Sequence, residues 1–388
     1  MDLSNLAQNS TGSMIRKMFN EALKIQDTIS FSVGEPDFIT PQPIIDAACE
    51  AWQRGLTHYT PNKGIPELCA AIARYHSSSL KPDPEKEIVI TCGGTEAIQL
   101  ALFTLVNHGD EVILPTPAWP NYFGQLAMCG AIVKQIPSLM KNNFVPDPDD
   151  IKKALSSKTK LVILNFPSNP TGATLDKETA QRIADVLRNT NAYIISDEVY
   201  SRIVFDNKPH ISILDFEDLR ERTVYINSFS KMFAMTGWRL GYAVADEAII
   251  TGMTKLHENG ASCLPAPSQL GAVAGLNSCD ADIEKMRVIF QKRRNIFCEG
   301  INSIPRLSCN IPGGAFYVFV NITETGVNSE TFCMRLLHKT GVVAVPGVGF
   351  GDAGETFVRF TVATSEKNIH EGLNRLRDFC LSGDFAQP

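Results

Sequence analysis

Apolar runs and amphipathic stretches alternate through the middle of the chain. Residues 95–110 and 176–190 repeat apolar side chains with the period of an amphipathic helix. Short runs rich in Val and Ile lie between such stretches, at residues 111–115, 160–166, 192–200 and 223–229. Continuous apolar strands separated by helices are typical of a parallel sheet that is covered on both faces. We therefore predict an α/β fold built on such a sheet.

The pattern changes after about residue 275. A long charged segment, residues 280–304, predicts a helix, and shorter strand-like runs and helices follow it to the end of the chain. This order of elements is typical of a smaller α+β unit. We predict a large domain over residues 46–275, and a small domain that combines residues 1–45 with residues 276–388.

Composition and charge narrow the class of protein. The 388 residues are 44% hydrophobic and 20% charged, with a net charge of −6 and no run of Lys and Arg. A nucleic-acid partner is therefore not expected. No stretch of about 18 uncharged apolar residues and no apolar leader occurs, so we expect a soluble, cytoplasmic protein without a membrane partner. The ten cysteines form no C-x-x-C, and the seven histidines form no cluster, so no metal site is expected.

Unusual polar residues follow three of the predicted strands. The sequence PSNPTG comes after the run that ends at Phe166, DEVY comes after residues 193–196, and SFSK comes after residues 224–227. In an open parallel sheet, ligands bind at the carboxyl ends of the strands. These segments therefore predict a ligand site at one edge of the sheet.

A second set of residues is suited to holding a phosphate. Gly94 and Thr95 lie between a strand at residues 87–90 and the helix that follows, and free N–H groups at a helix start bind anions. Ser228, Ser230 and Arg239 would add further donors. For Gly94 and Thr95 alone, a tight turn in which Thr95 caps the helix explains the same residues equally well.

The remaining polar residues match the other groups of one cofactor. Asp197 could pair with a protonated ring nitrogen, Asn169 and Tyr200 could bind a phenolate oxygen, and Trp119 offers a flat face for a ring. Lys231 could capture an aldehyde as a nucleophilic amine. Together they describe pyridoxal 5′-phosphate (PLP). The alternatives are a strand-end cap or an ion pair for Asp197, and a salt bridge for Lys231.

These segments resemble the class I/II aminotransferases of fold type I. The sequence SFSKMFAMTGWR (228–239) is similar to the family's lysine signature, and GEPDF, NPTG, SDEVY and PGGAFYVF occur in the family's order. The resemblance extends over nearly the whole chain and is closest to the aspartate and aromatic aminotransferase branch. It implies a large domain with a mostly parallel seven-stranded sheet between helices, and a smaller α+β domain.

The resemblance also implies roles for individual residues. Lys231, Asp197 and Tyr200 would be catalytic, and Lys231 would also move a proton at the substrate Cα. Arg359 would bind the substrate α-carboxylate, near the backbone of Gly34 and beside Trp119 and Asn169. Without the resemblance, the less favoured alternative for Arg359 is a stray charge on an edge strand. The cofactor-binding set would be Gly94, Thr95, Trp119, Asn169, Asp197, Tyr200, Ser228, Ser230, Lys231, Arg239 and Tyr59.

Tyr59 resembles the tyrosine that family dimers extend to the phosphate of the partner subunit. The resemblance therefore implies a homodimer with shared active sites. Taken alone, Tyr59 is equally well explained as a buried aromatic residue of a turn.

The activity that these resemblances imply is transamination between an L-amino acid and a 2-oxo acid. It would proceed by a ping-pong mechanism through pyridoxamine phosphate, with L-aspartate and 2-oxoglutarate as the best single guess for the substrates. An aromatic or other amino-acid aminotransferase is an alternative. A PLP-dependent C–S lyase or an aminocyclopropane-carboxylate-synthase-like enzyme would share Lys231, Asp197 and Arg359. A non-enzymatic PLP-binding module is a third possibility, which the completeness of the catalytic set disfavours.

Overall fold

Seven strands form the large sheet in the computed structural model of the chain, which describes residues 3–9 and 12–385. The strands are β2 (Ile88–Thr91), β3 (Glu111–Thr116), β4 (Ile132–Pro137), β5 (Thr159–Asn165), β6 (Tyr193–Asp197), β7 (Thr223–Ser228) and β8 (Gly241–Val244). Their order is β2-β8-β7-β6-β5-β3-β4; β8 runs antiparallel to β2 and β7, and the other pairs are parallel. The predicted α/β fold with a mostly parallel sheet is confirmed.

Helices cover both faces of this sheet because its strands are apolar on both sides. Val112 and Leu114 of β3 pack in one hydrophobic cluster, while Ile113 between them packs in another on the opposite face. The first face carries α5 (Gly93–Leu105), α6 (Pro120–Cys129) and α10 (Glu247–Gly260). The second face carries α7 (Pro148–Ala154), α8 (Lys177–Arg188), α3 (Gln42–Gln53), α4 (Pro66–Tyr75), α9 (Phe229–Met232) and α11 (Ala266–Ser278).

Helix α8 shows how local sequence sets one of these elements. The Asp176 side chain caps its start by accepting a hydrogen bond from the backbone N–H of Thr179, at 2.7 Å. The buried positions, Ala180, Ile183, Ala184 and Leu187, repeat at intervals of three and four residues. The predicted helix over residues 176–190 is therefore present, and it ends two residues earlier than the pattern suggested.

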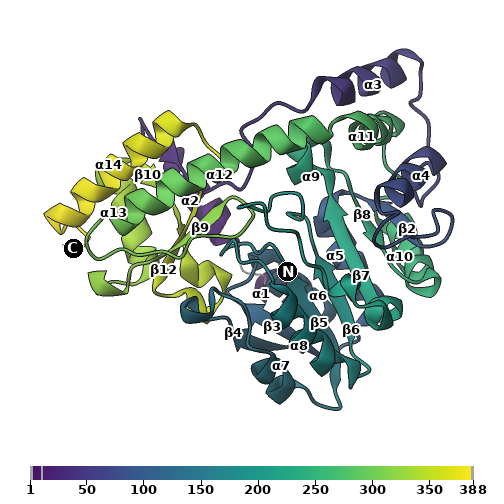
Figure 1. Cartoon of the computed structure of the whole chain (residues 1–388), viewed down its shortest axis with the longest axis horizontal. Helices are drawn as coiled ribbons and strands as arrows, with labels where there is room; N and C mark the ends of the chain where they lie inside the picture. The colour runs from purple at the N-terminus through teal and green to yellow at the C-terminus, as the bar shows by residue number, and fades with distance from the viewer. Residues whose placement is uncertain (1–2, 10–11, 386–388) are drawn as a thin grey trace.

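The C-terminal part of the chain forms smaller sheets with helices on one side. Strands β11 (Val345–Pro346), β12 (Phe357–Thr361) and β9 (Tyr317–Asn321) form an antiparallel sheet in that order, and β1 (Ile29–Ser30) pairs in parallel with β10 (Val342–Val343). The helices that pack here are α2 (Met14–Ala22), α12 (Asp280–Asn302), α13 (Ser329–Thr340) and α14 (Glu366–Ser382). The short helix α1 (Asn5–Asn9) precedes α2. Helix α12 runs from α11, beside the large sheet, to α14, beside the smaller sheets (Figure 1).

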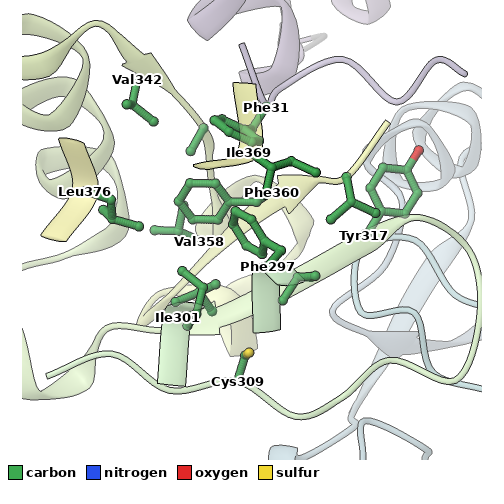
Figure 2. Close-up of a cluster of buried hydrophobic side chains, with 14 of the residues drawn as sticks. Phe31, Phe297, Ile301, Cys309, Tyr317, Val342, Val358, Phe360, Ile369 and Leu376 are labelled. Carbon is green, nitrogen blue, oxygen red and sulfur yellow. The ribbon is translucent and has the colours of Figure 1, made fainter. Parts of the chain in front are cut away.

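The N-terminal segment is built into the core of this smaller part. Phe31 packs against Phe297 of α12 and Phe360 of β12, with ring centroids 5.7 and 5.9 Å apart respectively. Figure 2 shows this cluster, with Tyr317 at its edge and the Tyr317 hydroxyl directed away from the other labelled side chains. The segment at residues 29–31 is therefore held by apolar packing as well as by strand pairing.

The predicted limits of the large domain, residues 46 and 275, fall inside α3 and α11, which pack against each other. The division into two domains at those residues stays a prediction. Among the residues that the structure describes, no helix is both long enough and apolar enough to cross a membrane.

Strand β8 approaches the start of α5 so closely that only glycine fits at Gly241. A Cβ atom there would lie 2.6 Å from the carbonyl carbon of Gly93 and 2.7 Å from the backbone nitrogen of Gly94. These are backbone atoms, which cannot move away as a flexible side chain can. The position of the first turn of α5 therefore depends on the absence of a side chain in β8.

We expect Gly241→Ala to destabilise the fold by about 1–3 kcal/mol, the usual cost of overpacking a dense interior. The measurement is urea unfolding of both forms under identical conditions. Gly237→Ala is the matched control, because nothing lies within 4 Å of a Cβ at Gly237. A control as destabilised as Gly241→Ala would show that the close contact is not the cause.

Candidate active site

A cavity of about 190 Å³ opens where the carboxyl ends of β5, β6 and β7 meet the smaller sheet. Every predicted site residue except Tyr59 lines this active-site cavity. The lining also includes Ile15 of α2, Asn165, Val199 and Tyr317. Residues that are far apart in the sequence therefore meet at the edge of the sheet where the sequence predicted a ligand.

Lys231 lies on α9, the short helix that follows β7, and its Nζ donates to the carbonyl of Gly34 at 2.7 Å. Burial lowers the pKa of Lys231 from 10.5 to about 8; Glu35 opposes the shift, and Arg239 and Arg359 add to it. No carboxylate among the described residues forms a salt bridge with Lys231, so the structure does not support the salt-bridge alternative. The residue has the properties of a nucleophilic amine.

Asp197 is buried at the end of β6. Its Oδ2 accepts a hydrogen bond from the Tyr122 hydroxyl, and its Oδ1 accepts one from the backbone N–H of Val199 at 3.3 Å. Burial raises the pKa of Asp197 to about 6, and these two hydrogen bonds oppose the rise. Asp197 does form the local turn contact expected of a strand-end cap, but its carboxylate also faces the cavity.

The start of α5 and the Arg239 guanidinium form one end of the cavity. Gly93 begins the helix with a φ of 73°, and its N-cap is Cys92, so Thr95 is inside the helix and does not cap it. Within residues 3–9 and 12–385, Arg239 donates only to the carbonyls of Thr236 at 2.9 Å and Cys92 at 3.4 Å. The first N–H groups of α5 and an arginine without a carboxylate partner create a site for an anion.

Ser228 and Ser230 lie beside this end, and both are buried. The Ser228 hydroxyl donates to the carbonyl of Leu240 at 3.0 Å and accepts from the backbone N–H of Ser230 at 3.2 Å. The pair therefore links the end of β7 to α9 and to the loop before β8. Both hydroxyls remain on the cavity wall, where they could reorient towards an anion.

Arg359 forms the opposite end of the cavity. It is 1% exposed on β12, the central strand of its sheet, so it is not a stray charge on an edge strand. Its guanidinium donates to the Asn169 Oδ1 at 3.0 Å and to the carbonyl of Ser32, and its Nε has no partner among the described residues. It also lies 4.6 Å from the ring centroid of Tyr317.

Alternation along β12 places Arg359 on one face with Phe357 and Thr361, and Val358 and Phe360 on the other. Val358 and Phe360 belong to the small-domain core, whereas Arg359 faces the cavity. Because side chains alternate between the two faces of β12, the buried Arg359 guanidinium lies in the cavity while its neighbours on either side lie in the core.

Trp119 and Tyr200 complete the middle of the cavity. Trp119 is the N-cap residue of α6 and lies edge-on to Tyr122, with ring centroids 5.4 Å apart. The Tyr200 hydroxyl is 2.8 Å from that of Tyr317, and burial raises the pKa of Tyr200 well above 10. Gly34 is close to the same tyrosine, because a Cβ at Gly34 would overlap the Tyr317 hydroxyl.

Tyr59 is the predicted residue that the structure does not bring to the cavity. It is 93% exposed, in the loop before α4, which rules out the buried turn aromatic that the sequence left open. Its neighbours on the surface include Trp52, which is 55% exposed. Its role towards a partner subunit stays a prediction.

Among the residues of the site that were not predicted from the sequence, Tyr122, Asn165 and Tyr317 form hydrogen bonds to predicted ones. Asn165 donates to the carbonyl of Asp197 and accepts from the backbone N–H of Asn169, each at 3.0 Å, so it joins two of the predicted residues. Tyr122 follows Trp119 by three positions, a spacing that could have identified it. Tyr317 lies within PGGAFYVF, but nothing in that sequence indicates its contact with Tyr200.

The side chains that line the cavity carry more positive than negative charge. Its lining residues include the cations Lys231, Arg239 and Arg359 but a single carboxylate, that of Asp197. Buried charges are normally paired. Among the residues that the structure describes, Arg359 instead contacts neutral oxygens and aromatic rings and no carboxylate. The cavity is therefore suited to ligands that carry negative charge at both ends.

Comparison with known proteins agrees with this geometry. Residues 26–376 match the family described as aminotransferase class I and II. The aspartate aminotransferase of Pyrococcus horikoshii is 42% identical over 94% of this chain and 93% of its own length. This chain belongs to the class I and II aminotransferases.

Other relatives of this aminotransferase are named for aspartate or for aromatic amino acids. The aromatic-amino-acid aminotransferase 2 of Thermococcus litoralis is 37% identical over 97% of each chain. A crystal structure of the aspartate aminotransferase from Thermus thermophilus with maleate matches with a TM-score of 0.93 and 32% identity, over 97% of this chain and 99% of that one. The predicted fold type and the prediction of an aminotransferase are therefore confirmed.

We expect the amine of Lys231 to become reactive at lower pH than that of an ordinary lysine. Because burial lowers its pKa, the free amine should predominate above pH about 8. Brief acetylation of the cofactor-free protein across a pH series, followed by peptide mass spectrometry, measures this directly. Lys153 is the internal control, because Asp150 raises its pKa. Identical profiles for the two lysines would contradict the shift.

Proposed function

We propose that this aminotransferase binds PLP in the active-site cavity and transfers the amino group of L-aspartate to 2-oxoglutarate. The observation that carries the proposal is the partly buried Lys231 amine, which has a lowered pKa, has no carboxylate partner among the described residues and shares its cavity with the Asp197 carboxylate.

The phosphate fits the end of the cavity at α5. The first N–H groups of that helix, the Ser228 and Ser230 hydroxyls and the Arg239 guanidinium surround this end. The helix dipole adds to their attraction for an anion. A side chain at position 94 would crowd this end of the cavity, because a Cβ at Gly94 would lie 3.3 Å from a methyl group of Val199, which also lines the cavity.

The ring fits between Trp119 and the ends of β5 and β6. Trp119 offers one aromatic face, the Asp197 carboxylate can pair with a protonated ring nitrogen, and Asn169 and Tyr200 can bind the phenolate oxygen. Lys231 then lies at the remaining corner, where it can bond covalently to the aldehyde carbon. These assignments agree with the roles that the resemblance implied.

Bound in this way, PLP supplies an electron sink for the pair of electrons left when the substrate Cα loses its proton. The protein supplies the rest. Lys231 would supply the nucleophilic amine, and it would also carry the proton from the substrate Cα as a general base. Asp197 holds positive charge on the ring nitrogen, and Arg359 fixes the substrate by its α-carboxylate.

The unpartnered Nε of Arg359 supports its assignment to the α-carboxylate. A guanidinium binds a carboxylate with two parallel hydrogen bonds, and a buried donor without a partner is costly unless a ligand satisfies it. The backbone of Gly34 lies beside the same space. Arg359 would thus bind the group that all amino-acid substrates share.

Aspartate is the proposed donor because several relatives are named aspartate aminotransferases and one of them was solved with maleate, a four-carbon dicarboxylate. An aromatic amino acid is the second candidate. Ile15 and Trp119 give the cavity apolar surface that an aromatic side chain could contact. The three cations of the lining are assigned to the cofactor and to the α-carboxylate, which leaves none of them for the side-chain carboxylate of aspartate. A relative named for aromatic amino acids supports the same reading.

We also propose that two chains form a dimer in which Tyr59 of each reaches the phosphate end of the other's cavity. The exposure of Tyr59 and Trp52 on one surface supports this arrangement. A large exposed aromatic surface on a soluble protein is typical of an interface.

The proposed function is tested by mixing the PLP-loaded enzyme with single amino acids, without any oxo acid. A transaminase releases one oxo acid per site and then stops until an acceptor such as 2-oxoglutarate is added. We expect aspartate to react fastest, with phenylalanine and tyrosine as the comparison. Continuous product formation without an acceptor would instead identify a lyase, and faster reaction with the aromatic pair would identify the second candidate.

A further inference from the structure

The first turn of α6 carries two aromatic residues that serve the same region of the cavity. Trp119 is the N-cap, and Tyr122 follows three positions later on the same side of the helix. Their rings meet at 90° with centroids 5.4 Å apart. Trp119 lines the active-site cavity, whereas Tyr122 is 1% exposed and lies behind it.

Tyr122 reaches past Trp119 to the Asp197 carboxylate. Its hydroxyl donates to Oδ2, and the backbone N–H of Val199 donates to Oδ1 at 3.3 Å. Among the residues that the structure describes, no other side chain donates to this carboxylate. An ionised carboxylate has about four acceptor positions, so these two contacts orient it and leave room for another donor on the cavity side.

A buried tyrosine needs a partner for its hydroxyl, and Asp197 could serve only that purpose. The groups around Asp197 indicate that Tyr122 also affects the charge of the carboxylate. Two other titratable groups interact electrostatically with Asp197: the Glu198 charge helps to raise the pKa of Asp197, and the Asp197 charge helps to raise the pKa of Tyr200. Neither of them donates a hydrogen bond to the Asp197 carboxylate. Burial raises the pKa of Asp197 to about 6, and the Tyr122 hydrogen bond is the first of the causes that oppose this rise.

We propose that Tyr122 is a positioning residue that keeps the Asp197 carboxylate ionised and aimed at the ring nitrogen of PLP. The inference rests on the proposed function, because it takes the cofactor to lie against Trp119 with its nitrogen towards Asp197. One helical turn would then set both the plane of the ring, through Trp119, and the partner of its nitrogen, through Tyr122.

The first test is the affinity for PLP of Tyr122→Phe, measured by equilibrium binding to the cofactor-free protein. We expect a loss of about tenfold, the size typical of one hydrogen bond to a charged group. Tyr242→Phe is the matched control. Tyr242 is also buried, and its hydroxyl is 2.9 Å from Nε2 of His76, but it does not line the cavity or contact Asp197. Its affinity for PLP should equal that of the wild type.

The second test replaces the ring nitrogen of PLP with carbon. This analogue offers Asp197 no N–H group, so loss of the Tyr122 hydroxyl should have little further effect on its binding. The inference predicts a large difference between wild type and Tyr122→Phe for PLP, and a small one for the analogue.

Equal losses with both cofactors would show that Tyr122 only supports the fold, and would overturn the inference while leaving the proposed function intact. Unchanged PLP affinity in Tyr122→Phe would overturn it as well. If the wild type itself failed to bind PLP, the proposed function would fail and the inference with it.

Discussion

The burial of Arg359 without a carboxylate partner is the constraint on which the rest of the site depends. A buried guanidinium is costly to desolvate, and in the described part of the chain its polar and ring contacts are the Asn169 side chain, the Ser32 carbonyl and two aromatic rings. Its Nε remains without a partner among the described residues. An arrangement of this kind is stabilised fully only when an anion binds, which is why a catalytic cavity explains it better than a structural core does.

The fold brings the necessary elements to that cation. Parallel strands place Asn169, Asp197 and Lys231 at one edge of the large sheet, since all three follow its carboxyl ends. The smaller antiparallel sheet approaches this edge from the other side and contributes Arg359 from its central strand. The N-terminal segment lies between the two sheets. Its Phe31 packs in the hydrophobic core of the smaller part, and the carbonyl of its Gly34 accepts a hydrogen bond from Lys231. Binding of a ligand with two anionic ends would therefore join both parts of the protein.

The large sheet and much of the site could be predicted from the sequence because both depend on local patterns. Apolar runs mark the strands, and the unusual polar residues follow directly after them. Tyr122 and Tyr317 were missed because their roles come from contacts with Asp197 and Tyr200, which are 75 and 117 positions away. Thr95 was considered as a helix cap, but the helix starts two residues before it, at Gly93. Tyr59 could be placed only on the surface, because its proposed contact requires a second chain.

The central claim is that the cavity binds two anions at opposite ends, the cofactor phosphate at Arg239 and the substrate carboxylate at Arg359. Parallel kinetics and dialysis of Arg359→Lys and Arg239→Lys test it most directly. Lysine keeps the charge but loses the paired hydrogen bonds, at a cost of about 1–3 kcal/mol. Arg359→Lys should raise KM for every amino acid and leave PLP retention unchanged, whereas Arg239→Lys should weaken PLP retention and change KM little at saturating cofactor. The same pattern in both variants, or an exchange of the two patterns, would contradict the account.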